Sequence, residues 1–307
     1  MLIALVLVGC TVETQEATTD TVHTFYIPVV FVGDSSNVGV MTESPMRSVA
    51  RWHNPTTAIK IAVRGADVMA SSTHYDWSKS DGILAGYHAD WINITTSPPW
   101  MAEDRIICNL PKSWYWHRYA EFVQAVIDRY HPDAVEIWNE PDIAYGDMPP
   151  EHAYFYGCVG DGEKYAEFSD YISENTSGAD VIIGALASPY TPFITDLTAH
   201  AEHYDGLSFH CYTRLYGSLF GDCRADYRQA ALWTDRPVYL SETAVLYRSG
   251  LESQYEQAQL VHYEQLQDIP TVWFWYTLAN NGWPVEMPTD MVSRSVPRPV
   301  WYEYIGQ

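Results

Sequence analysis

Short apolar runs alternate with amphipathic stretches along most of the chain. The runs have the length of β-strands, whereas the stretches between them repeat apolar residues at helical spacing, as Tyr119, Phe122, Val123 and Val126 do. Gly and Pro residues mark several of the returns from a helical stretch to the next run. This alternation is typical of parallel strands joined by crossover helices. The pattern therefore predicts an α/β fold with a parallel sheet.

The number of runs and the length of the chain narrow this prediction to one architecture. No internal repeat or low-complexity linker divides the 307 residues, and a (β/α)8 barrel commonly takes about 250 residues or more. We expect a single-domain (β/α)8 TIM barrel, with helices that include Trp116 to Tyr130, Glu163 to Glu174 and Glu252 to Leu266. The eight expected strands are Pro28 to Val32, Ala66 to Ser71, Trp91 to Thr95, Ala134 to Trp138, Val181 to Leu186, Leu207 to Cys211, Val238 to Ser241 and Thr271 to Tyr276.

The N-terminal residues differ from the rest of the chain. The first nine, MLIALVLVG, are apolar and too few to span a bilayer, and a Thr/Glu-rich stretch follows them. The string LVGC, which ends at Cys10, resembles a lipobox, whose Cys becomes the lipidated N-terminus. We interpret residues 1–10 as a lipoprotein-like export signal, 11–23 as a flexible tether and 24–307 as the barrel domain. Because no Lys or Arg precedes the apolar run, a start farther upstream and a chance apolar segment are the alternatives.

The five Cys residues fit export to an oxidising compartment. An odd number leaves one Cys to be explained, and lipidation of Cys10 would explain it. The other four allow three pairings. We favour Cys108 with Cys158 and Cys211 with Cys223, because each pair falls in neighbouring or identical loops of the predicted barrel. The alternative is that all four are buried free thiols.

Composition limits the class of partner. The net charge is −22, from 17 Lys+Arg against 39 Asp+Glu, so nucleic acid and anionic membrane surfaces are not expected as partners. The chain also contains 12 Trp and 23 Tyr, whose rings suit the apolar faces of sugars as well as core packing. A neutral partner therefore fits the composition better, and core packing is the alternative for most of the aromatic rings. The sequence carries no signal for an oligomeric state.

Common cofactor, metal and nucleophile motifs do not occur in the sequence. It has no HExxH, no paired CxxC, no GxSxG and no phosphate-binding Gly-rich motif. We therefore predict no metal, no cofactor and neither serine-hydrolase nor nucleotide chemistry.

Two acidic residues follow predicted strands at the edge where TIM barrels place their chemistry. Glu140 comes after the fourth strand, in AVEIWNEPD, and Glu242 comes after the seventh, in PVYLSETAV. Cleavage of a glycosidic bond needs two such carboxyl groups. A helix cap or a surface position is the structural alternative for each. Glu136, four residues before Glu140, is a rival that we expect to be a buried, paired structural acid.

These two strings resemble clan A of the glycoside hydrolases, nearest to families 39 and 5, and RYHPDAVEIWNEPD favours family 39. The resemblance runs from about Tyr75 to Tyr304 and includes TTSPPW, FHCY and WFWY. It implies a retaining enzyme without a cofactor, in which Glu140 is the general acid/base and Glu242 is the nucleophile. It also implies that Asn139 binds the sugar 2-hydroxyl and that Tyr212 donates a hydrogen bond to Glu242.

Aromatic and His residues near the predicted strand ends are further candidates for sugar contacts. Packing at the barrel rim is the alternative for the aromatic residues, and a metal or core position is the alternative for the strand 6 His. The candidates are Trp100, His210, Trp275, Tyr276, His74 and Trp77.

One departure from the clan pattern concerns strand 2. Clan members carry an Arg near its end that hydrogen-bonds the nucleophile, but the predicted strand in GADVMASS has none, and Arg64 precedes it. Either the strand lies elsewhere, another cation substitutes, or activity is weakened.

The expected function is hydrolysis of β-linked glycosides or polysaccharides outside the cell. A transglycosidase and a catalytically inactive carbohydrate-binding barrel are the alternatives.

Overall fold

The computed structural model describes residues 38–41, 46, 58–144, 157–190, 192–214, 223–246, 252–276, 292–293 and 296–297. The predicted export signal, the predicted tether and the predicted first strand, Pro28 to Val32, lie outside these residues.

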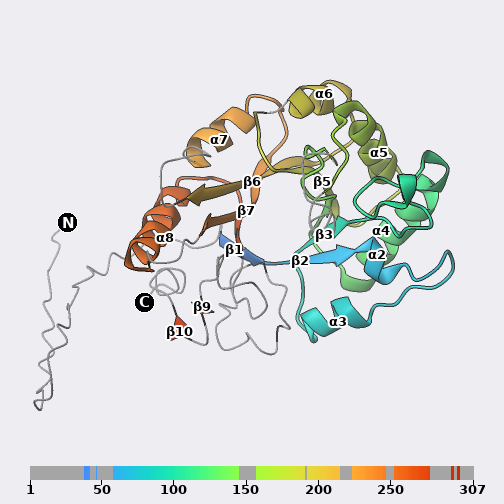
Figure 1. Ribbon diagram of the computed structural model, residues 1–307, viewed down its shortest axis with the longest axis horizontal. Helices are drawn as coiled ribbons and strands as arrows, with labels where there is room; N and C mark the ends of the chain where they lie inside the picture. Colours follow the sequence, from blue (N-terminus) through green and yellow to red (C-terminus); the bar gives the residue numbers. More distant parts are fainter. Residues whose placement is uncertain are drawn as a thin grey trace, which may run out of the picture. The chain divides into compact units, whose positions relative to one another are not determined.

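Eight parallel strands form a closed barrel (Figure 1). The barrel closes because β1 pairs with β2 on one side and with β8 on the other. The predicted (β/α)8 TIM barrel is therefore confirmed. The strands are β1 Val38–Met41, β2 Ala58–Arg64, β3 Trp91–Thr95, β4 Ala134–Ile137, β5 Asp180–Leu186, β6 Gly206–Arg214, β7 Val238–Leu246 and β8 Trp273–Tyr276.

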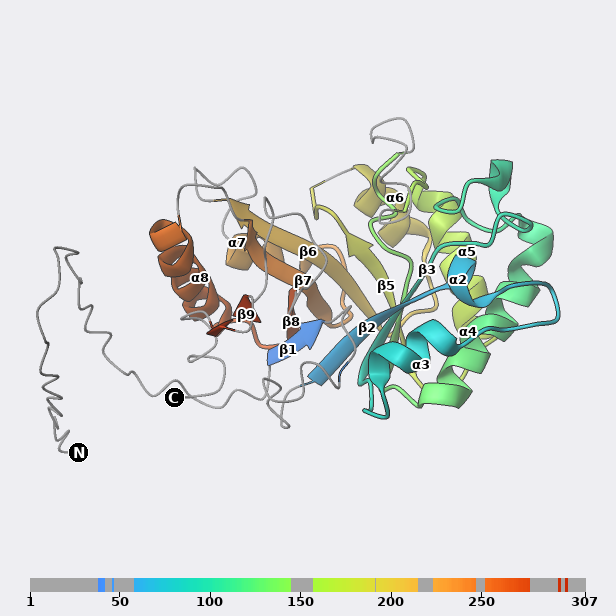
Figure 2. The ribbon, with the colours of Figure 1, turned by 60° about the horizontal axis from the view of Figure 1, so that its bottom comes forward.

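Helices surround the barrel on its outside (Figure 1). Figure 2 shows α3, α4 and α5 beside β2, β3 and β5, and α7 and α8 beside β6 and β7. The three predicted helices are confirmed, two of them with the predicted bounds. The described helices are α2 Gly65–Val68, α3 Ser78–Leu84, α4 Trp116–Tyr130, α5 Gly162–Glu174, α6 Pro192–His200, α7 Cys223–Ala230 and α8 Glu252–Leu266, with 3-10 turns η2 Glu103–Arg105 and η3 Ser113–Tyr115 and a small sheet of β9 Val292–Ser293 and β10 Val296–Pro297.

The longest predicted helix shows why these segments fold as they do. One face of α4 carries apolar residues, including Phe122, Val123 and Val126, and these are buried against the barrel. The helix ends at His131, which has a left-handed φ of 50° and whose N–H donates to the carbonyl of Ile127. Pro132 follows and leads directly into β4.

The second strand lies earlier in the chain than predicted. β2 is Ala58–Arg64, and the segment predicted as a strand, Ala66 to Ser71, begins with the short helix α2. The prediction was wrong because Lys60 interrupts the apolar run of β2, although its side chain is buried. Gly65 allows the turn after β2, since a Cβ there would lie 2.5 Å from the carbonyl oxygen of Thr96. Arg64 is consequently the last residue of β2.

Alternation along the strands sorts the barrel interior into three layers. The lowest layer is apolar, the middle layer is polar, and the upper layer combines apolar residues with the ionisable residues of the candidate site. The lowest layer contains Trp91, Ala134, Ile182 and Phe274, the middle layer contains Lys60, Asn93, Glu136 and Ser208, and the upper layer contains Met41, Ala62, Tyr276 and Tyr212.

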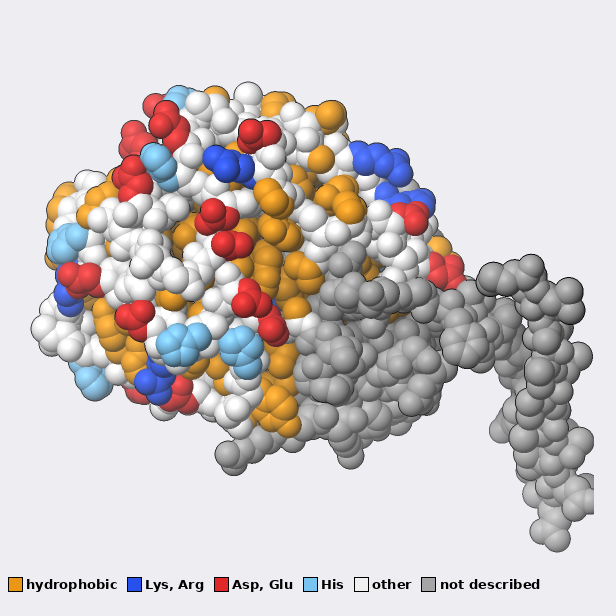
Figure 3. Space-filling view, turned by 180° about the vertical axis from the view of Figure 1, so that it is seen from behind, with side chains coloured by type: hydrophobic (Ala, Val, Ile, Leu, Met, Phe, Trp, Pro, Cys, Tyr) orange, Lys and Arg blue, Asp and Glu red, His pale blue; other side chains and the backbone are white. Residues whose placement is uncertain are grey.

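Two disulfides link segments around the barrel, one between two loops and one between β6 and the start of α7. Cys108 bonds to Cys158, and Cys211 bonds to Cys223, with Cα separations of 5.2 and 5.8 Å. The favoured pairing is therefore confirmed, and it is typical of exported proteins. Among the described residues, no helix combines the length and the apolar character that crossing a bilayer requires. On the face seen in Figure 3, acidic side chains are spread widely, and Lys and Arg form small separate groups.

Candidate active site

Glu140 lies just beyond the end of β4, in a segment whose backbone has positive φ values. Its φ is 46°, and its neighbour Trp138 has a φ of 73°. The Glu140 N–H donates to the carbonyl of Ala185, 2.8 Å away on β5. Positive φ values of non-Gly residues concentrate at functional sites, where the surrounding structure maintains them. The WNEP segment therefore turns out of the strand and holds the Glu140 side chain at the barrel mouth.

Glu242 lies on β7 beside a change in strand register. In the pairing of β6 with β7, the register shifts between Phe209 and His210, so that His210 pairs with Glu242. A second shift separates Leu240 from Thr243 in the pairing of β7 with β8. Such irregularities re-aim side chains next to active sites.

The two carboxyl groups converge on one imidazole. His210 Nδ1 lies 2.9 Å from Glu140 Oε1 and 3.6 Å from Glu242 Oε2. The separation of these two oxygens therefore cannot exceed the sum of the two distances. Tyr212 donates a hydrogen bond of 2.6 Å to the same Glu242 Oε2. β4, β6 and β7 thus bring the four side chains into one buried cluster.

Burial and charge set the protonation of this cluster. Burial raises the pKa of the Glu140 carboxyl, as does the nearby negative charge of Glu242, although the hydrogen bond with His210 opposes them. Burial lowers the pKa of His210, but the charges of Glu242 and Glu140 outweigh this effect, so that its pKa is raised overall. Burial and the charge of Glu242 also raise the pKa of Tyr212, which therefore stays protonated and can donate. Within the described part of the chain, Glu140 Oε2 has no hydrogen-bond partner.

A buried ion pair forms the floor below these residues. Lys60 Nζ lies 2.6 Å from Glu136 Oε2, and both side chains are fully buried. Asn93 and Ser208 donate to the two carboxylate oxygens of Glu136, at 3.0 and 2.6 Å. Glu136 is therefore buried and paired, as predicted. Lys60 was missed by the sequence analysis, although a single Lys inside an apolar run is the signal that points to such a buried cation.

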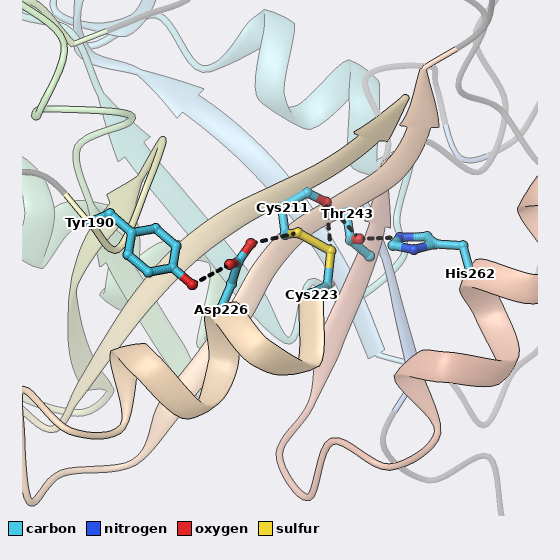
Figure 4. Close-up of a disulfide and its surroundings, with 6 residues drawn as sticks. All are labelled: Tyr190, Cys211, Cys223, Asp226, Thr243 and His262. Carbon is cyan, nitrogen blue, oxygen red and sulfur yellow. Dashed lines mark hydrogen bonds between the residues drawn. A yellow bond between two sulfur atoms is a disulfide. The ribbon is translucent and has the colours of Figure 1, made fainter. Parts of the chain in front are cut away.

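The disulfide between Cys211 and Cys223 holds the end of β6 (Figure 4). Thr243 on β7 donates to the carbonyl of Cys211 at 2.8 Å. Asp226 Oδ2 lies 3.3 Å from the Cys211 sulfur, and Tyr190 donates to the other oxygen of Asp226 at 2.7 Å. Because Cys211 lies between His210 and Tyr212 in the chain, these contacts fix the backbone that presents both residues.

Comparison with solved structures shows which proteins share this architecture. A family 39 glycoside hydrolase from Bacteroides cellulosilyticus WH2 is 14% identical with a TM-score of 0.61, and the match covers 88% of this chain but only 62% of that enzyme. A family 10 glycoside hydrolase from Paenibacillus barcinonensis is 16% identical with a TM-score of 0.60, covering 89% and 95%. A psychrophilic family 10 endo-β-1,4-xylanase is 13% identical with a TM-score of 0.63, covering 88% and 96%. The sequence itself matches no protein-family model and no curated protein.

This chain has the fold of clan A glycoside hydrolases. Arg64 ends β2, so the departure noted in the sequence resulted from the misplaced strand. Among the described residues, no group of three or more His, Cys, Asp or Glu side chains is arranged to hold a metal ion.

TIM barrels place their active sites at the C-terminal ends of the strands, and three of the predicted sugar contacts lie near these ends. Tyr276 ends β8 and faces Tyr212, with ring centroids 6.3 Å apart. Trp100 follows β3, is partly buried and donates its indole N–H to the carbonyl of Met69 at 3.3 Å. Asn139 is half-buried, and its carbonyl accepts from the N–H of Gly157.

Three other predicted contacts lie elsewhere. Trp275 is fully buried and points outward from β8, with its ring beside Tyr263 of α8, because alternation along the strand turns Phe274 and Tyr276 inward instead. Trp77 stacks on Phe122 of α4 with ring centroids 6.1 Å apart. His74 is exposed, in the loop after α2. The structure places neither Trp275 nor Trp77 in the cluster of Glu140 and Glu242.

Proposed function

We propose that this protein is a retaining glycoside hydrolase in which Glu140 is the general acid/base and Glu242 is the nucleophile. The observation that carries the proposal is the convergence of both carboxyl groups on His210 Nδ1, at 2.9 and 3.6 Å. A retaining mechanism needs the two carboxyl groups about 5 to 5.5 Å apart, so that one of them can bond to the sugar directly. The short path through one imidazole nitrogen supports this spacing.

The different environments of the two acids suit different roles. Glu140 is buried, its pKa is raised, and Glu140 Oε2 has no partner among the described residues. It is therefore suited to carry a proton toward the oxygen of a leaving group. Glu242 Oε2 accepts a hydrogen bond of 2.6 Å from the hydroxyl of Tyr212, a contact that holds its carboxylate in place for attack.

The reaction proceeds in two displacements. In the first, the Glu242 carboxylate attacks the anomeric carbon while Glu140 transfers its proton to the glycosidic oxygen, so that the bond breaks and an alcohol leaves. In the second, the Glu140 carboxylate takes a proton from water, whose oxygen attacks the same carbon and releases Glu242 as a carboxylate. The two inversions give net retention, and no cofactor takes part.

The substrate we propose is a β-linked oligo- or polysaccharide outside the cell. Asn139, Tyr276 and Trp100 supply polar and aromatic groups near the mouth, and His210 adds a buried imidazole. The two disulfides support an extracellular location. The family 10 enzymes with this fold include endo-β-1,4-xylanases, and a family 128 endo-β-1,3-glucanase was solved with laminaripentaose. Lipid anchoring at Cys10 belongs to the same proposal.

Mechanism-based labelling tests the proposal. Activated 2-deoxy-2-fluoro β-glycosides of several sugars are incubated with the protein, and peptides are then mapped by mass spectrometry. We expect a stoichiometric label on Glu242, no label on Glu242→Gln, and retained labelling of Glu140→Ala, because an activated leaving group needs no acid. A label on another residue, or no label with any sugar that the protein hydrolyses, would contradict the assignment.

A further inference from the structure

Lys60 is a fully buried cation that the proposed mechanism does not use. It lies in the middle of β2, between the apolar lowest layer and the candidate site. Its ammonium group donates to the carbonyl of Ser241 at 2.9 Å and pairs with Glu136 at 2.6 Å. The face of the Phe274 ring lies below, 5.9 Å from Nζ to the centroid.

The same ammonium group also faces Glu242. Lys60 Nζ lies 3.9 Å from Glu242 Oε1, whereas Tyr212 and His210 approach the other oxygen of that carboxylate, Oε2. The two oxygens of Glu242 thus contact side chains of different strands, Oε2 those of β6 and Oε1 that of β2. The carbonyl that Lys60 holds belongs to Ser241, the residue before Glu242 in the chain. Lys60 therefore contacts the backbone that presents Glu242 and acts electrostatically on its carboxylate.

Stability alone does not explain the ion pair. Replacing a buried ion pair by apolar residues of similar volume is often neutral or stabilising, because both charges must be removed from water. The layer below the ion pair is apolar, so apolar replacements would continue it. Burial raises the pKa of Glu136, but the charges of Lys60 and His210 outweigh burial and lower its pKa overall, so that Glu136 is ionised and shares the Lys60 charge with Glu242.

We propose that Lys60 is a positioning residue for Glu242, which orients the attacking carboxylate and attracts its negative charge from β2, and that Glu136 moderates this effect by pairing with the same ammonium group. The inference rests on the proposed function. Ionisable groups lie around this region on several elements: Lys60 and Arg64 on β2, Glu136 on β4, Glu140 just beyond β4, His210 and Tyr212 on β6, and Tyr276 on β8. β1 and β3 contribute no ionisable side chain in their described residues.

The test measures kcat/KM against pH for an activated aryl β-glycoside. With such a substrate, the acidic limb of the profile reports the ionised nucleophile, since departure of the aryl group needs little acid assistance. Lys60→Met keeps an unbranched side chain, one heavy atom shorter, and removes the charge. We expect its acidic limb to move to higher pH by about 1 unit or more, the shift that an opposite charge within about 4–6 Å produces.

Glu136→Gln provides the opposite test. It frees the Lys60 charge to act on Glu242, so we expect the acidic limb to move to lower pH. The double variant Lys60→Met with Glu136→Gln removes both charges of the ion pair, so Glu136 is not left as an unpaired carboxylate. Its acidic limb should move to higher pH by less than that of Lys60→Met alone. Val126→Ala, in the α4 core away from the site, serves as a destabilised control whose limb should stay in place.

The outcomes separate this inference from the proposed function. If the unmodified protein is not labelled at Glu242, the proposed function fails. If the unmodified protein is labelled but the folded Lys60→Met variant keeps its acidic limb, Lys60 serves the fold alone and the inference is overturned. If Lys60→Met does not fold, the test is the kcat/KM profile of Glu136→Gln. An acidic limb that moves to lower pH supports the inference, and an acidic limb that stays in place overturns it.

Discussion

Glu140 is the residue at which burial and a second negative charge act in the same direction. Both raise the pKa of its carboxyl group, so the proton is retained to higher pH than on an exposed Glu. Activity that depends on this proton is therefore present below the raised pKa and is lost as the pH rises through it. The single residue thus sets the alkaline limb of the expected pH profile.

Removal of this acid should affect substrates unequally. We expect Glu140→Ala to slow substrates with poor leaving groups by about 10²–10⁴-fold, while activated aryl glycosides keep most of the rate of their first displacement. The alkaline limb should also disappear. Steady-state and burst kinetics on a series of aryl and alkyl β-glycosides would measure this, and equal losses across the series would refute the acid role.

Asp142 offers a residue-scale prediction about stability. Its carboxylate accepts the N–H groups of Ala187 and Ser188 at 2.8 and 3.2 Å and so joins the end of β4 to the end of β5. Burial and the charge of Glu140 raise its pKa from 3.8 to about 6. The folded state then binds this proton more tightly than the unfolded chain does, so the free energy of unfolding falls as the pH rises through that interval.

Asp142→Asn should therefore flatten this dependence. The amide cannot ionise and still offers one oxygen to the backbone. We expect the fall in Tm of the unmodified protein between pH of about 4 and 6 to be smaller in the variant. Thermal unfolding followed by circular dichroism across this range measures it, and parallel pH dependences for the two proteins would contradict the prediction.

At the scale of elements, the disulfide that joins β6 to α7 controls two site residues. Cys211 lies between His210 and Tyr212, and its partner Cys223 begins α7. The double variant Cys211→Ala with Cys223→Ala should lower the free energy of unfolding by about 3 kcal/mol, as expected for a short closed loop. It should also reduce kcat/KM, because the end of β6 is released.

The pair Cys108→Ala with Cys158→Ala is the stability comparison. Its loop is longer, with a sequence separation of 50 against 12, so removing it should destabilise the fold at least as much. Assays below the Tm of each variant would separate the effects. Lost stability with unchanged kcat/KM after removal of the β6–α7 disulfide would show that it does not position the site.

Helices α4 and α8 and strand β3 were predicted with the correct bounds, whereas β2, which buries a Lys inside its apolar run, was not. The bounds of α4, α8 and β3 match the prediction, and in α4 the apolar residues recur at helical spacing. The predicted position of β2 was wrong because the barrel buries Lys60, and a charged residue inside an apolar run indicates the end of a strand. The buried charge of Lys60 is stabilised by pairing with Glu136, which another strand, β4, contributes.

At the scale of the whole molecule, excess negative charge opposes the compact state. A net charge of −22 leaves repulsion that dissolved ions screen, with a Debye length of about 10 Å at 0.1 M salt and about 3 Å at 1 M. We expect Tm at neutral pH to rise with sodium chloride concentration over this range. The same titration near the isoelectric point is the control and should show little effect, and a Tm that falls with salt at neutral pH would contradict the argument.

The sequence by itself determined the strand–helix alternation, the expected barrel and the two candidate carboxylates, because periodicity and the strings WNEP and SET are local properties of the chain. It only favoured the two disulfide pairings, and the structure shows them. Only the tertiary structure decided that Glu140 and Glu242 share His210, that Trp275 faces α8, and that Lys60 lies beneath Glu242. These relations join strands far apart in the sequence. They depend on register, side-chain direction and barrel closure, and no single segment encodes them.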